Sequence, residues 1–307
     1  MKIKEKYIMN QSDKRAKKQS AKRKLSDNLL ALYFLTLLLI LLGQNLGMLV
    51  YLIPHMTNTD VGATIAMYLS FIGIWILAVA YMRFTKKNRP ILEAIGRNAS
   101  GNNWKNLLFG FFIGFVLNGI CILAAWLHKD ISLYYDSFQP LYFVLIFLAV
   151  FVQSSAEELI CRGFLYQRLR RSYRHPAVAL IGNSMFFAVL HLMNDGITVL
   201  SVLNIFIVGI LFSFMVYYMD SIWCAMAMHT AWNFTQNILF GLPNSGIVSL
   251  YSVFRLEAST ANNSFAYNVG FGIEGTLFAD AILLLACVCI YLWGKKYGRK
   301  PRETRGF

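Results

Sequence analysis

Two adjacent acids, Glu157 and Glu158, lie within a long apolar segment, and Arg162 follows one helical turn later. Charged side chains at membrane depth cost several kcal/mol unless they are paired or face water, so such a cluster usually marks a functional site. Glu158 and Arg162 are four residues apart with the acid first, the favoured order for a helical ion pair. Glu157 is rotated by about 100° from Glu158 around the helix axis. It therefore points elsewhere and is free for chemistry, although packing pairs or an ion path could also explain both acids.

Two later apolar segments each carry one histidine. His191 follows Phe187 by four residues, and Asn233 follows His229 by four, so each pair shares one helix face. A single histidine in a membrane helix often serves only as a hydrogen bond between helices. Two polar groups stacked on one stripe must face protein or water, however, so the second pair favours a functional site.

Membrane helices are the elements that must position these residues. The chain has 307 residues, of which 57% are hydrophobic and only 14% charged, less charge than a soluble domain shows. Apolar runs of roughly 20 residues match the ~30 Å hydrocarbon core. We therefore predict an all-α polytopic membrane bundle of about eight transmembrane helices. The expected spans are approximately 29–53, 62–82, 106–127, 141–168, 177–193, 197–218, 222–240 and 276–294.

The basic residues predict the orientation of this bundle. The net charge is +14, and the lysines and arginines cluster in the tails and in the loops 83–105 and 169–176. The loops 54–61, 128–140 and 241–275 hold few basic residues. Because basic loops stay inside, eight spans place both termini in the cytoplasm.

The same patterns divide the chain. We expect a basic disordered cytoplasmic tail over 1–27, a transmembrane domain over 28–294 and a basic cytoplasmic tail over 295–307. The catalytic core is expected at about 141–240, and 241–275 is expected to be an exterior loop, with a lid as one interpretation. The lysine-rich tail and the lack of a eukaryotic targeting signal favour a multi-pass protein of the bacterial plasma membrane.

Composition also bears on partners. Basic tails are expected to contact anionic lipid head groups. Nucleic-acid binding would want aromatic residues interleaved with the basic ones, and the tails have few, so no nucleic-acid partner is predicted. The cysteines lie in predicted spans without a CxxC pair, which favours packing over a disulfide frame or a zinc site. They are Cys121, Cys161, Cys224, Cys287 and Cys289.

Depth along the helices permits the polar residues to meet. At ~1.5 Å per residue, Glu157 lies ~17 Å from the cytoplasmic face and His191 ~21 Å. By the same measure, His229 lies ~10 Å deep and Asn233 ~16 Å deep. The four side chains could therefore line one cavity near the middle of the membrane.

The spacing of these residues resembles the three motifs of the CPBP (CAAX protease and bacteriocin-processing, Abi) family of intramembrane proteases. The patterns EExxxR, FxxxH and HxxxN occur in this order on successive predicted helices, within about 141–240. The matching residues are Glu157, Glu158, Arg162, Phe187, His191, His229 and Asn233. One departure is Cys161, where members often carry phenylalanine.

The resemblance implies an eight-helix endopeptidase that hydrolyses a peptide bond in a membrane-associated protein or peptide. It implies that Glu157 and His191 activate a water as general base and that His229 and Asn233 stabilise the oxyanion. The ion pair of Glu158 with its arginine would hold the site together.

The resemblance leaves the cofactor open, because the family has been described both as metalloproteases and as metal-independent glutamate proteases. Glu157, His191 and His229 are a plausible zinc set with one open position. No HExxH motif occurs, however, and a metal would leave Asn233 less clearly explained, so we favour no cofactor.

Two other functions remain open at this point. The chain could be a non-catalytic immunity or regulatory protein that binds a bacteriocin or a membrane sensor. It could also be an ion-coupled transporter, although the inverted repeats and broken helices typical of transporters are not seen.

Overall fold

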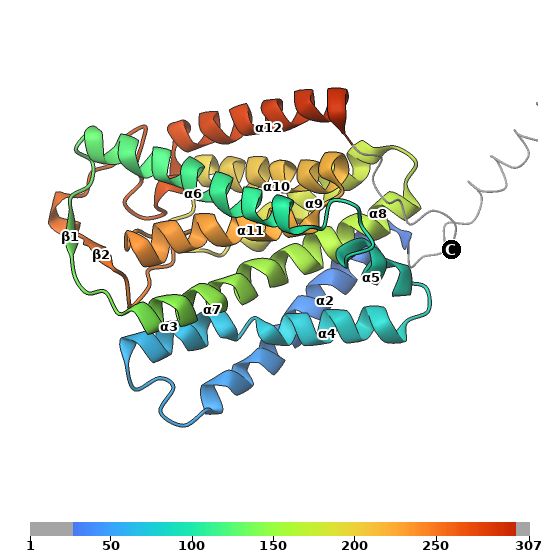
Figure 1. The fold of residues 1–307 in the computed structure, drawn as a ribbon, viewed down its shortest axis with the longest axis horizontal. Helices are drawn as coiled ribbons and strands as arrows, with labels where there is room; N and C mark the ends of the chain where they lie inside the picture. The colour runs from blue at the N-terminus through green and yellow to red at the C-terminus, as the bar shows by residue number, and fades with distance from the viewer. Residues whose placement is uncertain (1–26, 299–307) are drawn as a thin grey trace, which may run out of the picture.

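The computed structural model describes residues 27–298, and its helices run along the length of the molecule (Figure 1). In chain order the α-helices are α2 (Leu29–Gly47), α3 (Asp60–Leu69), α4 (Ile72–Phe84), α5 (Arg89–Ile95), α6 (Trp104–Leu127), α7 (Pro140–Glu158), α8 (Tyr166–Ser172), α9 (Pro176–Leu190), α10 (Val199–Met219), α11 (Ile222–Asn233) and α12 (Leu277–Tyr297). Two short strands, β1 (Leu133–Tyr135) and β2 (Phe254–Leu256), pair antiparallel with Leu133 opposite Leu256.

The structure is a polytopic helical bundle, as predicted. Six helices within the described residues are long and apolar enough to cross a membrane, and they are Leu29–Leu52, Asp60–Phe84, Trp104–Leu127, Pro140–Ser172, Val199–Met219 and Leu277–Tyr297. The shorter apolar helix α9 and the continuous helix from Ile222 to Leu239 account for the other two predicted spans. Large apolar side chains cover the outside, for example Leu30 at 73% exposure and Phe112 at 64%, as expected for a surface that faces lipid.

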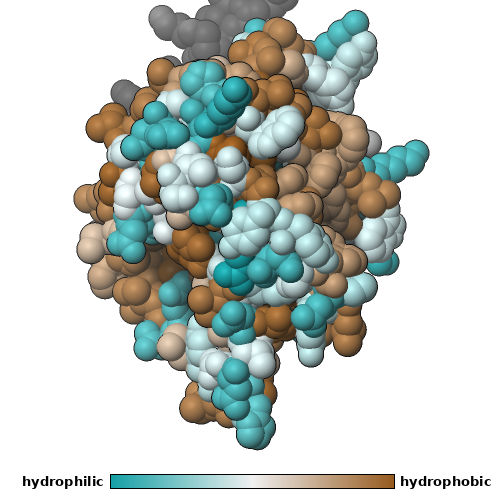
Figure 2. All heavy atoms as spheres, turned by 90° about the vertical axis from the view of Figure 1, so that its left-hand side faces the viewer, coloured by the Kyte–Doolittle hydropathy of each residue, from teal (hydrophilic) through white to brown (hydrophobic). Residues whose placement is uncertain are grey.

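The two ends of the bundle differ in charge. Helix α2 begins and α12 ends at the same end of the molecule, where α5 and α8 also lie (Figure 1). The arginine- and lysine-bearing loops after α4 and α8 are at this end (Figure 1), and it is the end for which the cytoplasmic side is predicted. At the opposite end, which contains the β1–β2 pair, polar side chains form a face with apolar side chains around it (Figure 2).

Three expected boundaries differ from the structure. The span 62–82 lies within the membrane-spanning segment Asp60–Phe84, but the α-helix is interrupted between Leu69 and Ile72. The Ser70 hydroxyl donates to the Met67 carbonyl (2.7 Å) at this point. Such serine bonds to the preceding turn compete with the helix and bend it. The tail expected from 295 begins later, because α12 continues to Tyr297, where lysines at a helix C-terminus are favourable.

The basic tail expected over 1–27 also ends differently. Asp27 is ion-paired with Lys87 (2.6 Å) and with Arg168 (2.8 Å), so this residue is part of the folded bundle. The remainder of that tail, 1–26, and residues 299–307 lie outside the described residues.

Two helices of the core contain π-helical segments. Helix α7 continues through a π-helix at Leu159–Leu165 into α8, and α11 continues through a second one at Phe234–Leu239. In these segments the backbone N–H bonds to the carbonyl five residues earlier, as from Tyr166 to Cys161. Such turns are rare and often occur at functional sites. The first begins directly after the glutamate doublet and contains Arg162, and the second begins directly after Asn233.

Helix α11 is held against α6 by a Gly-x-x-x-Gly pair. A Cβ atom added at Gly110 would lie 2.3 Å from the Cys224 carbonyl oxygen, and one at Gly114 would lie 2.4 Å from the Met228 oxygen. Only glycine permits this approach of two backbones, the usual device for packing membrane helices closely. The pair therefore sets the position of the helix that carries His229.

Replacing Gly114 by alanine is expected to lower the stability of the folded protein by about 1–3 kcal/mol, because the new methyl group forces α6 and α11 apart. Thermal unfolding in detergent would measure the change. Gly119→Ala is the matched control on the same helix, because no atom lies within 4 Å of its added Cβ. Equal stability of the two variants would contradict the close packing.

Candidate active site

The structure brings four of the predicted site residues to one cavity of about 490 Å³. Glu157 comes from the end of α7, and His191 follows directly after the last residue of α9. His229 and Asn233 lie one turn apart on α11. All four side chains line the cavity, so three separate helices contribute to a single site.

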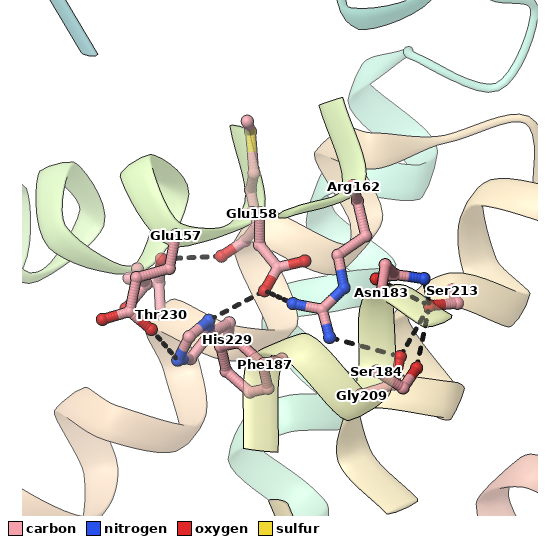
Figure 3. A network of polar contacts seen from close by, with 12 residues as sticks. Glu157, Glu158, Arg162, Asn183, Ser184, Phe187, Gly209, Ser213, His229 and Thr230 are labelled. Carbon is pink, nitrogen blue, oxygen red and sulfur yellow. Dashed lines mark hydrogen bonds and ion pairs between the residues drawn. The ribbon is translucent and has the colours of Figure 1, made fainter. Parts of the chain in front are cut away.

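Glu158 and Arg162 form the predicted ion pair beside this cavity (Figure 3). The Nη1 atom of Arg162 donates to Oε1 of Glu158 at 2.9 Å, and neither side chain is exposed. Nη2 donates to the Gly209 carbonyl at 3.2 Å, and the guanidinium lies over the Phe187 ring, 4.4 Å from its centroid. These contacts offset part of the cost of burying the two charges, while Oε2 of Glu158 and Nε of Arg162 have no hydrogen-bond partner among the described residues.

The ion pair is connected to two further helices through Gly209 of α10 (Figure 3). The hydroxyl of Ser213 donates to the same carbonyl at 2.7 Å, and Nδ2 of Asn183 on α9 donates to this hydroxyl at 3.0 Å. Helices α7, α9 and α10 therefore share one hydrogen-bond network. Asn183 is thus a polar contact between two apolar helices, a common role of asparagine in membrane proteins.

His229 lies between the two acids of the doublet (Figure 3). Its Nδ1 atom is 3.1 Å from Oε1 of Glu158, and its Nε2 atom is 3.9 Å from Oε2 of Glu157. The ring is stacked on Phe212 with centroids 5.2 Å apart. Because an ionised carboxylate can only accept, Nδ1 carries the hydrogen of the shorter contact. Glu158 thereby fixes the orientation of the imidazole.

The two acids of the doublet occupy different environments, as their rotation about the helix predicted. The side chain of Glu158 is fully buried, whereas that of Glu157 is 18% exposed and lines the cavity. Oε1 of Glu157 accepts a hydrogen bond of 2.6 Å from Nε2 of Gln153, one turn earlier on α7. This bond orients the free carboxylate and leaves Oε2 toward His229.

His191 is held by its own helix. Its Nδ1 atom lies 2.9 Å from the carbonyl oxygen of Phe187, so Nδ1–H donates and Nε2 of the neutral ring is left with a lone pair. No hydrogen bond or ion pair joins His191 to Glu157 in the described part of the chain. Both side chains line the same cavity.

Asn233 is hydrogen-bonded on both sides of its amide. Its Nδ2 atom donates to Oε1 of Gln153 at 3.1 Å and to the hydroxyl of Ser154 at 3.3 Å. Its Oδ1 atom accepts from Nδ2 of Asn244 at 3.3 Å. The amide orientation is therefore determined by α7 on one side and by the loop after α11 on the other.

Several residues of the site were missed in the sequence. Gln153 could have been found, because it precedes Glu157 by four residues and so lies on the same helix face. Asn244 and Glu274 line the cavity from the loop between α11 and α12. Nothing in the sequence indicates this, because a loop has no period that shows which side chains turn inward.

Glu157, His191 and His229 are the side chains named as possible zinc ligands. Within residues 27–298 no group of three histidine, cysteine or acidic side chains is placed to hold a metal ion. Nδ1 of His229 is bonded to Glu158, and its Nε2 lies 3.9 Å from Oε2 of Glu157. Two ligands that are each ~2 Å from one zinc ion lie about 3–4 Å apart, so the metal independence of the site stays a prediction.

One wall of the cavity borders the lipid-facing surface. Leu37 and Leu41 of α2 line the cavity, yet they are 38% and 53% exposed. Met67 and Tyr68 of α3 continue this wall. An apolar chain in the membrane could therefore reach the polar residues without crossing the bulk of the bundle.

Comparisons with known proteins agree with the motifs. Residues 139–235 match the family model described as type II CAAX prenyl endopeptidase Rce1-like. The protein YyaK of Bacillus subtilis (strain 168), named as uncharacterized, is 31% identical over 195 residues. This alignment covers 60% of the chain and 62% of YyaK, so the chain spans less than two thirds of that relative. No solved structure matches the chain.

The matched segment runs from the start of α7 to the beginning of the second π-helix, and it contains all three polar motifs. The structure shows why these motifs occur together, since their side chains line one cavity or form the ion pair beside it. The family match and this shared geometry make the segment 139–235 similar to the type II CAAX prenyl endopeptidase Rce1-like family.

Proposed function

We propose that this protein is an intramembrane endopeptidase that hydrolyses a peptide bond in a membrane-associated protein or peptide. The observation that carries the proposal is the convergence of Glu157, His191, His229 and Asn233 on one cavity among membrane helices. The cavity has a volume of about 490 Å³. This is enough for a peptide segment and a water molecule, because one water takes up about 30 Å³ in the liquid. The family match supports a CAAX-type protease activity.

Glu157 and His191 are the proposed bases. Oε2 of Glu157 and Nε2 of His191 both have free lone pairs, and both side chains line the cavity. The water oxygen attacks the peptide carbonyl carbon, and its proton passes to one of these bases. The same proton then moves to the leaving nitrogen as the C–N bond breaks, so that an acid and an amine are released.

His229 and Asn233 are the proposed donors to the oxyanion, and Asn233 would exchange its bond to Gln153 or to Ser154 for the bond to the oxyanion. The cluster contains two carboxylates, Glu157 and Glu158, against the single guanidinium of Arg162. A second proton on His229 makes the cluster neutral and turns Nε2 into a donor toward the cavity. Donors that are held in place in a region of low dielectric constant are worth most where charge develops.

We further propose that the substrate enters from the membrane beside α2, where Leu37 and Leu41 are exposed and line the cavity. Anionic lipid head groups are the proposed contacts of the basic tails. The bacterial plasma membrane is the proposed location, supported by the relative in Bacillus subtilis and by the basic residues gathered at one end of the bundle.

Replacing Asn233 by alanine is expected to lower kcat for peptide cleavage by about 10²–10³-fold, the usual effect of losing one oxyanion donor. The measurement uses protein purified in detergent and a panel of fluorogenic membrane peptides, with and without a prenyl group. The control is Asn262→Ala, because Asn262 is an exposed asparagine of the exterior loop.

A chelator in the same assay tests the proposed metal independence, and cleavage is expected to continue in its presence. Loss of cleavage that zinc restores would favour a metalloprotease instead. Absence of cleavage by the wild-type protein, or full activity of Asn233→Ala, would contradict the proposal and favour a non-catalytic immunity or regulatory protein.

A further inference from the structure

A buried acid in the exterior loop, Glu274, accepts four hydrogen bonds. Oε1 accepts from Nε1 of Trp232 at 3.0 Å and from Nδ2 of Asn244 at 2.7 Å. Oε2 accepts from Nε2 of Gln236 at 2.8 Å and from the backbone N–H of Ser245 at 3.1 Å. The residue is only 5% exposed. All four lone-pair sites of a carboxylate are used, so this group is an anchor and not a ligand for substrate.

Glu274 holds a turn that is hydrogen-bonded both to α11 and to the turn after α9. Nδ2 of Asn244 donates to Glu274 and also to Oδ1 of Asn233 (3.3 Å). The carbonyl of Ser245 accepts from Nδ2 of Asn194 at 2.9 Å, and the N–H of Asn194 bonds to the carbonyl of His191 at 3.0 Å. One carboxylate is thus connected to the amide on α11 and to the turn after α9.

The backbone conformation at Ser245 indicates that these hydrogen bonds hold the turn in place. Ser245 has φ +48°, in the left-handed region that favours glycine. A residue other than glycine keeps this backbone conformation only when several contacts with its surroundings hold it there. The two bonds to Ser245, at its N–H and at its carbonyl, provide this constraint.

We propose that Glu274 is a positioning residue of the site: through Asn244 and Ser245 it orients the Asn233 amide and holds the turn that carries His191. The catalytic part of this inference rests on the proposed protease function. The exterior loop is then part of the active site, although it lies beyond the segment that matches the family model.

Glu274→Gln tests the anchor itself. The variant has nearly the same shape, but a carboxamide has one acceptor oxygen, so one pair of the four donors must face an NH₂ group. Hydrogen–deuterium exchange is expected to become faster in the segments 191–198 and 242–247. Glu257→Gln is the matched control, because Glu257 is an exposed acid of the same loop. Unchanged exchange in both segments would overturn the proposal, whether or not a substrate is known.

Asn244→Ala tests the connection to Asn233 and leaves the Glu274 carboxylate in place. This variant still tests the proposal if Glu274→Gln fails to fold. Each variant is expected to lower kcat by about 10–100-fold with KM nearly unchanged, because small misplacement of a catalytic group costs about this much. In an Asn233→Ala background, Asn244→Ala is expected to add less than about twofold, since residues that act through one group are not additive.

The outcomes separate this inference from the proposed function. If Glu157→Gln is inactive while Asn244→Ala and Glu274→Gln keep the wild-type kcat, the positioning role is wrong and the protease function stands. If the effects of Asn233→Ala and Asn244→Ala multiply, Asn244 acts by a different route and the proposal is overturned. If Glu157→Gln cleaves like the wild type, the proposed function fails, and hydrogen exchange alone decides the anchor.

Discussion

Replacing Glu157 by glutamine is expected to reduce peptide cleavage by at least about 100-fold, within the ~10²–10⁴ that a general base contributes. Glutamine keeps the shape of the side chain and can still accept the bond from Gln153. Its amide cannot take up the proton of an attacking water. The variant is therefore expected to insert, fold and melt like the wild type while its kcat falls.

The comparison with Glu158→Gln makes this prediction specific. Glu158 is fully buried and paired with both Arg162 and His229, so its neutral variant is expected to lose stability as well as activity. Thermal unfolding and single-turnover cleavage on both variants separate the two roles. A Glu157→Gln protein that retains more than about a tenth of the wild-type rate would exclude Glu157 as the base, because a general base contributes at least ~10².

Removing the guanidinium is expected to produce the largest loss of stability. Arg162→Met leaves the Glu158 carboxylate buried without a cation, and breaking such a pair typically costs about 3–5 kcal/mol. The Gly209 carbonyl and the face of Phe187 lose their contacts with the cation in the same step. Thermal unfolding in detergent, or the yield of folded protein in membranes, measures the effect.

A second substitution checks that the cause is the unpaired charge. The double variant Glu158→Gln with Arg162→Met is expected to recover part of the stability, because it removes both charges together. Arg97→Met is the control, since Arg97 is an exposed arginine of the loop after α5. A double variant that is as unstable as Arg162→Met would show that packing, not charge, causes the loss.

The bundle could be predicted from the sequence because most of its spans are long apolar runs whose length matches the membrane. The apolar runs at 106–127 and 197–218, for example, agree with α6 and α10 to within two residues. The different directions of Glu157 and Glu158 could also be predicted, since helical rotation alone separates neighbours. Both predictions rest on the regular geometry of the α-helix, which the spacing of residues in the sequence reflects directly.

Contacts between helices could not be predicted in the same way. The bond from His229 to Glu158 depends on the depth and rotation of α11 against α7, and the close approach at Gly110 and Gly114 contributes to both. The inward position of Glu274 depends on a loop with no repeating pattern. The predicted span 62–82 is interrupted near Ser70, although the apolar pattern of the sequence continues through this point.

The π-helices at the first and third motifs affect where the chain can vary in length. A turn of this kind takes up more residues than an α-helical turn, so Glu157 and Arg168 do not keep the phase of one uninterrupted α-helix. Deleting one residue between Leu159 and Leu165 would let the wide turn close to an α-helical one, so Arg168 would keep Asn88 and Asp27 while the doublet still faces the cavity. The same deletion within the α-helical part of α7 would rotate the doublet by about 100° relative to the helix before it. Relatives with this site should therefore differ by single residues in length at the π-helices and not within α7.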